Sequence, residues 1–155
     1  MIYRSNSPKE TQKIASNLAK TVDNRLRKSV IHRGVVIALE GELGAGKTTF
    51  VQGFAKALGV KSNIQRPTFN IIKKYPISSN GYSLMAICYL YHIDCYRLKD
   101  HKEAMPLGIK DIFEEPDCFV LIEWPERISK ILPKKLTKVH IDHIAPSKRK
   151  ITIKK

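Results

Sequence analysis

Apolar residues recur at three- and four-residue steps in two segments of the chain, and this spacing predicts two helices. The first covers residues 8 to about 27, and Ser7 precedes it as an N-terminal cap. The second covers residues 47–58, and Gly59 follows it as a C-terminal stop. We therefore expect an amphipathic helix near the start of the chain and a second helix that ends at Gly59.

Two continuous apolar runs have the length of core strands. Residues 35–39 form one, and residues 118–122 form another of the kind that is buried on both faces of a parallel sheet. A short helix should begin with proline at residues 125–132. Residues 100–113 have mixed polarity and contain proline and glycine, so we expect broken helix and turn there.

The remaining strands are predicted in two hairpins. Residues 68–75 and 82–95 flank a turn at 78–81, and we expect them to pair antiparallel. Residues 136–144 and 150–154 should close the chain as two strands around a short turn. No repeat, long linker or low-complexity tract interrupts this pattern, so residues 1–155 should form one domain. The expected fold class is α/β, a single domain with a mixed sheet flanked by helices.

Charge and composition narrow the choice of partners. Lys and Arg outnumber Asp and Glu by 28 to 14, and the excess is concentrated in residues 130–155. Such a basic end could bind nucleic acid or could be a solvated surface. The second reading is favoured, because no aromatic interleaving or RNA-binding motif accompanies the lysines.

Three cysteines, Cys88, Cys95 and Cys118, lack metal-ligand spacing and are expected to pack as small core residues. The longest apolar segment, residues 82–91, is about half the roughly 20 residues that cross a bilayer. The amino terminus also lacks the apolar core of a secretion signal. We therefore expect a cytoplasmic protein with no membrane partner.

Candidate chemistry begins in residues 41–48, GELGAGKT, which match the phosphate-binding pattern G-x-x-x-x-G-K-[ST] directly behind an apolar strand. In this pattern backbone N–H groups surround phosphate oxygens, Lys47 reaches the β and γ phosphates, and the Thr48 hydroxyl holds Mg²⁺. The alternative is a ligand-free glycine turn, which rarely ends in Lys and Thr. The sequence therefore predicts a nucleoside triphosphate site, and the expected α/β fold is a single-domain P-loop NTPase-like mixed sheet flanked by helices.

Hydrolysis also needs a carboxylate at the end of a neighbouring strand. Asp94 and Glu123 both follow apolar strands and should reach the carboxyl edge of the sheet. Either could instead be a helix cap or a surface ion pair. His92 could carry a proton, but on an alternating strand it shares the side of Asp94 and could simply hydrogen-bond it, and this structural role is favoured. Trp124, the one tryptophan, could cover the nucleotide site or simply pack.

Five blocks occur in order along the chain: GELGAGKTT at 41–49, RPTF at 66–69, YHIDCYRL at 91–98, LGI at 107–109 and IEWP at 122–125. With these blocks the chain resembles the TsaE family, the bacterial ATPases of tRNA threonylcarbamoyladenosine (t6A) biosynthesis. The resemblance implies an α/β domain that binds ATP and Mg²⁺. It also implies work with TsaD and TsaB, which modify adenosine 37 of tRNA, and contact with tRNA that is indirect or weak.

The resemblance also implies roles for particular residues. Thr48 and Glu123 match Mg²⁺ ligands, and Asp94 matches the catalytic carboxylate, assisted by Glu123 and Lys47. Thr68 matches a switch-like residue, and Trp124 a neighbour of the nucleotide. Residues that match ATP-binding positions are Thr11, Gly44, Ala45, Gly46, Lys47, Thr48, Thr49 and Arg149, with Thr11 and Arg149 near the adenosine.

Three departures from the family pattern are visible. Arg66 stands where serine usually precedes Pro-Thr, so it could alter the switch loop or supply charge near the γ phosphate. Residues 81–87 lengthen the hairpin before Asp94. Lys148 replaces a glycine before Arg149, which weakens the expected adenosine contact.

Two other functions stay open at this point. A small-molecule kinase would share the size and the phosphate-binding loop, although the chain shows no arginine-rich lid. The second is an RNA-binding module, which would use the basic carboxyl end and hold nucleotide as a structural ligand. An ATPase that is slow alone and dependent on its partners remains the leading prediction.

Overall fold

A computed structural model of the chain describes residues 1–28, 34–67, 70–77 and 89–155. In these residues seven strands form one sheet in the order β1-β7-β6-β2-β5-β4-β3. The central strands β6, β2, β5 and β4 are parallel, and β3, β7 and β1 join antiparallel, so the sheet is mixed as expected. The strands are β1 (Ile2–Ser5), β2 (Val35–Glu40), β3 (Ile72–Pro76), β4 (Tyr89–Asp94), β5 (Cys118–Glu123), β6 (Thr137–Ala145) and β7 (Lys148–Lys154).

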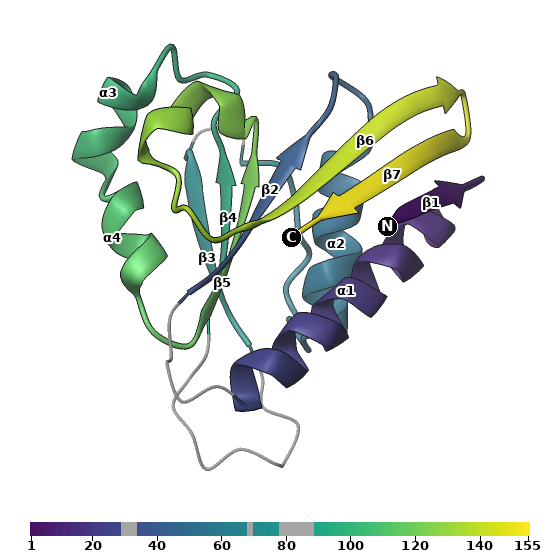
Figure 1. Ribbon diagram of the computed structural model, residues 1–155, viewed down its shortest axis with the longest axis horizontal. Coiled ribbons are helices and arrows are strands. Elements are labelled where there is room, and N and C mark those ends of the chain that lie inside the picture. Colours follow the sequence, from purple (N-terminus) through teal and green to yellow (C-terminus); the bar gives the residue numbers. More distant parts are fainter. Residues whose placement is uncertain (29–33, 68–69, 78–88) are drawn as a thin grey trace.

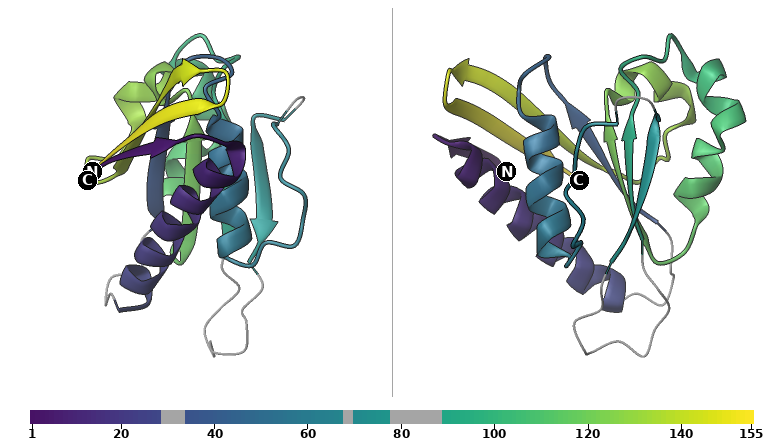
Figure 2. Two further views of the ribbon diagram at one scale, coloured as in Figure 1. Left: turned by 90° about the vertical axis from the view of Figure 1, so that its right-hand side faces the viewer. Right: turned by 180° about the vertical axis from the view of Figure 1, so that it is seen from behind.

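Helices cover the two faces of the sheet. Figure 1 shows α1 and α2 on one side and α3 and α4 on the other, and the view from behind in Figure 2 agrees. Each side has its own buried apolar cluster, because side chains alternate between the faces along every strand. The helices are α1 (Pro8–Lys28), α2 (Lys47–Ala57), α3 (His101–Ala104) and α4 (Ile109–Glu114), with 3₁₀ helices η1 (Met105–Leu107) and η2 (Pro125–Ile131).

The two predicted helices are confirmed with their caps. The amide of Glu10 donates to the Ser7 hydroxyl at 3.2 Å, which caps α1 as expected. Gly59 has a φ of 83° and its amide donates to the Lys56 carbonyl, which ends α2. α1 and α2 lie very close together, since a Cβ built on Gly53 would lie 2.4 Å from Cα of Gln12.

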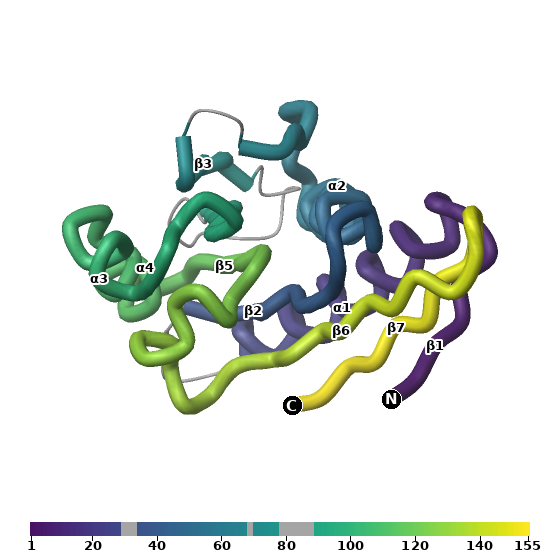
Figure 3. Tube along the Cα trace, turned by 90° about the horizontal axis from the view of Figure 1, so that it is seen from above, coloured from purple at the N-terminus to yellow at the C-terminus, as the bar shows by residue number. Residues whose placement is uncertain are grey.

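Strand β5 is buried along its whole length between β2 and β4, as its continuous apolar run predicts. The broken helix at residues 100–113 is confirmed as α3, η1 and α4. The closing hairpin is also confirmed, and Figure 3 shows β6 and β7 extending the sheet along α1. Among the helices described, none combines the length and the apolar character needed to cross a bilayer.

Two strand predictions need correction. β3 begins at Ile72 rather than at residue 68, although it does pair antiparallel with β4. β4 ends at Asp94, one residue before the predicted end, although the Cys95 amide still donates to the Glu123 carbonyl at 3.0 Å. The predicted turn at 78–81 and residues 82–88 of the predicted strand lie outside the described residues. Strand β1 has no counterpart in the predictions. Three of its four residues are exposed, and it is held by pairing with β7, so its sequence carries little alternation.

Candidate functional site

The loop from β2 to α2 depends on backbone shapes that favour glycine. Gly41 has a φ of 141°, and a Cβ there would lie 2.4 Å from the Ile141 carbonyl oxygen, so β6 leaves no room for a side chain. Ala45 is fully buried beneath the loop, and its amide donates to the Glu42 carbonyl at 3.1 Å. The close approach of β6 to Gly41 and the burial of Ala45 therefore hold the loop against the sheet.

The N-terminus of α2 is open to an anion. The cap residue is Gly46, which has no side chain to satisfy the first amides, and the first turn contains no acidic residue. The helix dipole places partial positive charge at this end. An oxyanion fits the donors that this turn presents.

A cavity of about 260 Å³ lies over this helix end. It brings together seven of the predicted site residues, drawn from the loop, α2 and the end of β5. Ala45 lies beneath it, while Thr11, Asp94 and Arg149 do not line it. The lining residues are Leu43, Gly44, Gly46, Lys47, Thr48, Thr49, Arg66, Glu123 and Trp124.

Lys47 is 5% exposed and holds the loop from inside. Its Nζ donates to the carbonyls of Gly41 and Glu42 at 2.5 and 2.9 Å, and lies 3.9 Å from the centre of the Trp124 ring. Burial lowers the pKa of Lys47 below its ordinary value, and the negative charge of Glu123 acts in the opposite direction. The Lys47 ammonium therefore lies between two loop carbonyls and the face of the Trp124 ring.

Glu123 is 2% exposed and joins the loop to the sheet. Its Oε1 accepts a hydrogen bond from the Thr48 hydroxyl at 2.9 Å and lies 2.9 Å from Nε2 of His92. The two predicted Mg²⁺ ligands are thus direct neighbours. The expected His92 to Asp94 hydrogen bond is wrong. His92 bonds to Glu123 on the adjacent strand instead, because β4 and β5 lie in parallel register and both side chains point to the α2 face.

Asp94 and Glu123 are paired neighbours across β4 and β5, so the two carboxylates do meet at the carboxyl edge as predicted. Asp94 is 4% exposed, and its Oδ2 accepts from Nε of Arg66 at 2.7 Å. Its Oδ1 accepts from the amide of Tyr96 at 3.0 Å. Tyr96 was not among the predicted site residues, although its ring packs 5.1 Å from the Trp124 ring. Its place in the YHIDCYRL block was the available clue.

Trp124 has an unusual backbone for a bulky residue, with φ 60° and ψ 50°. This left-handed turn ends β5 and lets Pro125 begin η2. It also places the indole against Lys47 on one side and against the apolar cluster below α3 and α4 on the other. The ring therefore lines the cavity and packs in the core at once.

Arg149 reaches the loop from the far end of the chain. Its Nε donates to the Ala45 carbonyl at 2.8 Å, and its NH2 lies 3.3 Å from the Gly44 carbonyl. Thr11 is buried and its hydroxyl is 2.8 Å from that of Ser5, at the junction of α1 and β1. Their predicted nearness to adenosine stays a prediction. Thr68 lies outside the described residues.

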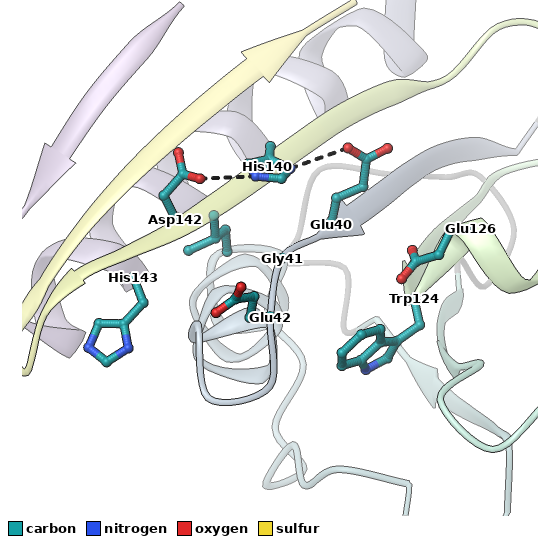
Figure 4. Close-up of a pocket in the computed structure, with 9 residues that line it drawn as sticks. Glu40, Gly41, Glu42, Trp124, Glu126, His140, Asp142 and His143 are labelled. Carbon is teal, nitrogen blue, oxygen red and sulfur yellow. Dashed lines mark hydrogen bonds and ion pairs between the residues drawn. The ribbon is translucent and has the colours of Figure 1, made fainter.

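A larger cavity, of about 540 Å³, lies beside the loop, between the end of β2, the middle of β6 and the start of η2 (Figure 4). In it His140 bonds to Glu40 at 3.4 Å and to Asp142 at 3.1 Å. Glu42 and Glu126 also line it, and so many carboxylates repel a triphosphate. Despite its size, this cavity therefore suits a phosphate less well than the smaller one, which is lined by Lys47, Arg66 and the start of α2.

The chain is similar to known proteins in both sequence and fold. A family model described as "Threonylcarbamoyl adenosine biosynthesis protein TsaE" matches residues 5–151. The TsaE protein of Bacillus subtilis (strain 168) is 36% identical over 150 residues, covering 97% of this chain and 82% of the relative. That of Haemophilus influenzae is 36% identical over 118 residues, covering 76% and 69%. The crystal structure of YdiB from Bacillus subtilis superimposes with a TM-score of 0.68 at 33% identity, covering 99% of this chain and 83% of that one. The chain belongs to the TsaE family.

Proposed function

We propose that this protein is a Mg²⁺-dependent ATPase that assists the threonylcarbamoylation of adenosine 37 in tRNA by TsaD and TsaB. Family membership supports the pathway, and the cavity over α2 supports the nucleotide. One observation carries the proposal. The Thr48 hydroxyl and the Glu123 carboxylate are joined at 2.9 Å beside Lys47, at a helix end that has no cap of its own.

The phosphate groups fit the donors of this cavity. The open amides of the α2 N-terminus and the loop suit the β phosphate, and Lys47 exchanges its carbonyl partners for β and γ oxygens. Such an exchange is favourable, because a charge-assisted bond to phosphate is stronger than one to a neutral carbonyl. The hydrogen bond from Arg149 to the Ala45 carbonyl keeps the Gly46 amide, which belongs to the same peptide, oriented away from Arg149.

Mg²⁺ fits Thr48 and Glu123, which together offer a hydroxyl and a carboxylate oxygen. When bound, the ion neutralises charge that develops on the β and γ phosphates. In the described part of the chain no group of three or more His, Cys, Asp or Glu side chains could hold a metal ion. A single carboxylate suits Mg²⁺, which usually keeps waters and substrate phosphates as its other ligands.

Since Glu123 is assigned to Mg²⁺, Asp94 is the carboxylate that orients the attacking water and accepts its proton. Its Oδ1 and Oδ2 are held by Tyr96 and Arg66, so the side chain has a fixed orientation at the sheet edge next to Glu123. In the reaction the water oxygen bonds to the γ phosphorus, and the bond to the β,γ-bridging oxygen breaks. ADP leaves with that electron pair, and Asp94 accepts the water proton before solvent takes it up.

Calorimetry tests the nucleotide site first. Wild-type protein with Mg²⁺ should give heat on titration with ATP, and Lys47→Ala should lose most of it, whereas Lys56→Ala, an exposed lysine on the same helix, should not. Retention of full ATP affinity by Lys47→Ala would remove the basis of the site. The pathway role is tested by reconstituting tRNA modification with purified TsaD and TsaB.

In that reconstitution, hydrolysis by the chain alone should be slow and should change markedly when TsaD and TsaB are added. Asp94→Ala and Glu123→Ala should each reduce modification over many turnovers. Equal hydrolysis rates with and without the pair, combined with full modification by both variants, would overturn the proposed coupling.

A further inference from the structure

Arg66 is a second cationic side chain at the phosphate cavity, and the mechanism above uses it only to hold Asp94. It lies in the segment between α2 and β3 and lines the cavity together with Lys47, Thr48 and Glu123. Its side chain is 38% exposed, so it is reachable from the cavity mouth.

Two contacts hold the Arg66 guanidinium in one orientation. Nε donates to Oδ2 of Asp94 at 2.7 Å, and Cζ lies 5.1 Å from the centre of the Tyr96 ring. The hydrogen bond to Asp94 is the main cause that raises the pKa of Arg66, so its charge is constant at every working pH. No described residue accepts a hydrogen bond from its two terminal nitrogens. Within the part of the chain that the structure describes, both are therefore available to an anion.

Arg66 and Lys47 bring like charges to one cavity. Both side chains line the cavity over α2. Burial is the main cause that lowers the pKa of Lys47, and the positive charge of Arg66 acts in the same direction. Asp94 and Glu123 offset this repulsion from the strand ends. An anion bound between Arg66 and Lys47 would offset the repulsion between these two cations directly.

We propose that Arg66 is an arginine finger supplied by the chain itself, whose terminal nitrogens bind the γ-phosphate oxygens as the bond to ADP breaks. The proposal rests on the ATPase function proposed above. A planar guanidinium fits two phosphate oxygens at once, and its charge counts most where negative charge develops. Its Nε bond to Asp94 couples the finger to the carboxylate that orients the water.

The same contact allows an opposite role, in which Arg66 locks Asp94 and slows hydrolysis. The two roles predict opposite changes when the arginine is removed. Arg66→Ser removes the charge and the fork together, Arg66→Lys keeps the charge without the fork, and Arg25→Ser removes an exposed arginine from α1 as a charge-matched control.

Single-turnover ATP hydrolysis by the chain alone is the main measurement. We expect Arg66→Ser to slow it at least about 10-fold and up to about 10³-fold, with Arg66→Lys in between and Arg25→Ser unchanged. Calorimetry adds a readout that needs no turnover. ADP with aluminium fluoride, a mimic of the transferring phosphoryl group, should bind wild type more tightly than Arg66→Ser, whereas ADP alone should bind both equally.

The arginine-finger proposal would be wrong if Arg66→Ser hydrolysed ATP at an unchanged or faster rate. It would also be wrong if wild type and Arg66→Ser bound ADP with aluminium fluoride with equal affinity. Neither result touches the ATPase proposal, provided that wild type hydrolyses ATP and Lys47→Ala does not bind it. Wild-type protein that neither binds nor hydrolyses ATP would instead remove both proposals together.

Discussion

Nε2 of His92 lies 2.9 Å from Oε1 of Glu123, and both side chains are buried. An ionised carboxylate only accepts hydrogen bonds, so Nε2 carries the proton of this bond. The same oxygen accepts from Thr48. His92 does not line the cavity over α2, so it is a positioning residue that holds the glutamate toward the loop.

Removing this support should weaken the metal site before it weakens nucleotide binding. We expect His92→Leu to raise the Mg²⁺ concentration that half-saturates hydrolysis by about 10- to 100-fold, with little change in ATP affinity measured in EDTA. His92→Gln can donate from a similar place and should restore much of the loss. If leucine and glutamine variants respond to Mg²⁺ alike, the histidine is only packing.

Glu123→Gln should affect the metal more directly. The amide keeps the size of the side chain but removes the negative charge that attracts Mg²⁺, so hydrolysis should fall at least about 100-fold at low Mg²⁺ and recover in part at high Mg²⁺. Glu126→Gln, an exposed glutamate near the same strand end, is the control. A Mg²⁺ titration of steady-state hydrolysis measures both, and identical curves would contradict the assignment of Glu123 as a ligand.

Asp94→Asn should separate binding from chemistry. The amide cannot take a proton from water, so kcat should fall by about 10²- to 10⁴-fold, while ATP affinity by calorimetry should stay within about threefold. Asp142→Asn, at the larger cavity, should leave hydrolysis unchanged. A rate for Asp94→Asn within twofold of wild type would transfer the catalytic role to another group.

Gly53→Ala tests the packing of α1 on α2. A Cβ there would lie 2.4 Å from Cα and the carbonyl oxygen of Gln12, which are backbone atoms that cannot turn aside. Alanine favours helix by about 1 kcal/mol, yet we expect a net loss of about 1 to 3 kcal/mol in the free energy of unfolding. Urea denaturation against Lys56→Ala as a control measures this, and a stabilised Gly53→Ala would show that the helices can separate freely.

Cys95 should resist thiol reagents in the folded protein. Burial raises the pKa of its thiol to about 12, so only about one molecule in ten thousand carries the thiolate at pH 8. Iodoacetamide labelling followed by peptide mapping should show modification of Cys95 in urea but not in native protein. Because the folded pKa is raised, this group contributes stability below about pH 9 that is lost as the pH rises toward 12. Rapid native labelling at pH 8 would contradict this burial.

Much of the fold follows from local patterns. Helical spacing and caps define α1 and α2, and the glycine loop behind β2 fixes where the second helix starts. The meeting of Asp94 and Glu123 was also predictable, because parallel strands share their carboxyl edge. These features depend on near neighbours in sequence or on one general rule of α/β sheets.

What could not be predicted depends on strand order and register. The alternation of side chains along β4 correctly places His92 on the same face as Asp94. It does not reveal that β5 lies beside β4, so the hydrogen-bond partner of His92 was predicted wrongly. The bonds from Arg149 to Ala45 and from Arg66 to Asp94 join residues 104 and 28 positions apart. β1 was missed because a short exposed edge strand is defined by its partner and not by its own sequence.

Trp124 is the one tryptophan of the chain, and its indole touches the ammonium of Lys47. If that ammonium turns to a phosphate when nucleotide arrives, the surroundings of the ring change with it. Light at the long-wavelength edge of the protein absorption band excites tryptophan but not tyrosine. The fluorescence would then come from Trp124 alone, beside the phosphate-binding loop. The unmodified protein thus carries its own optical probe, with which the rate of nucleotide arrival can be followed in a stopped-flow instrument.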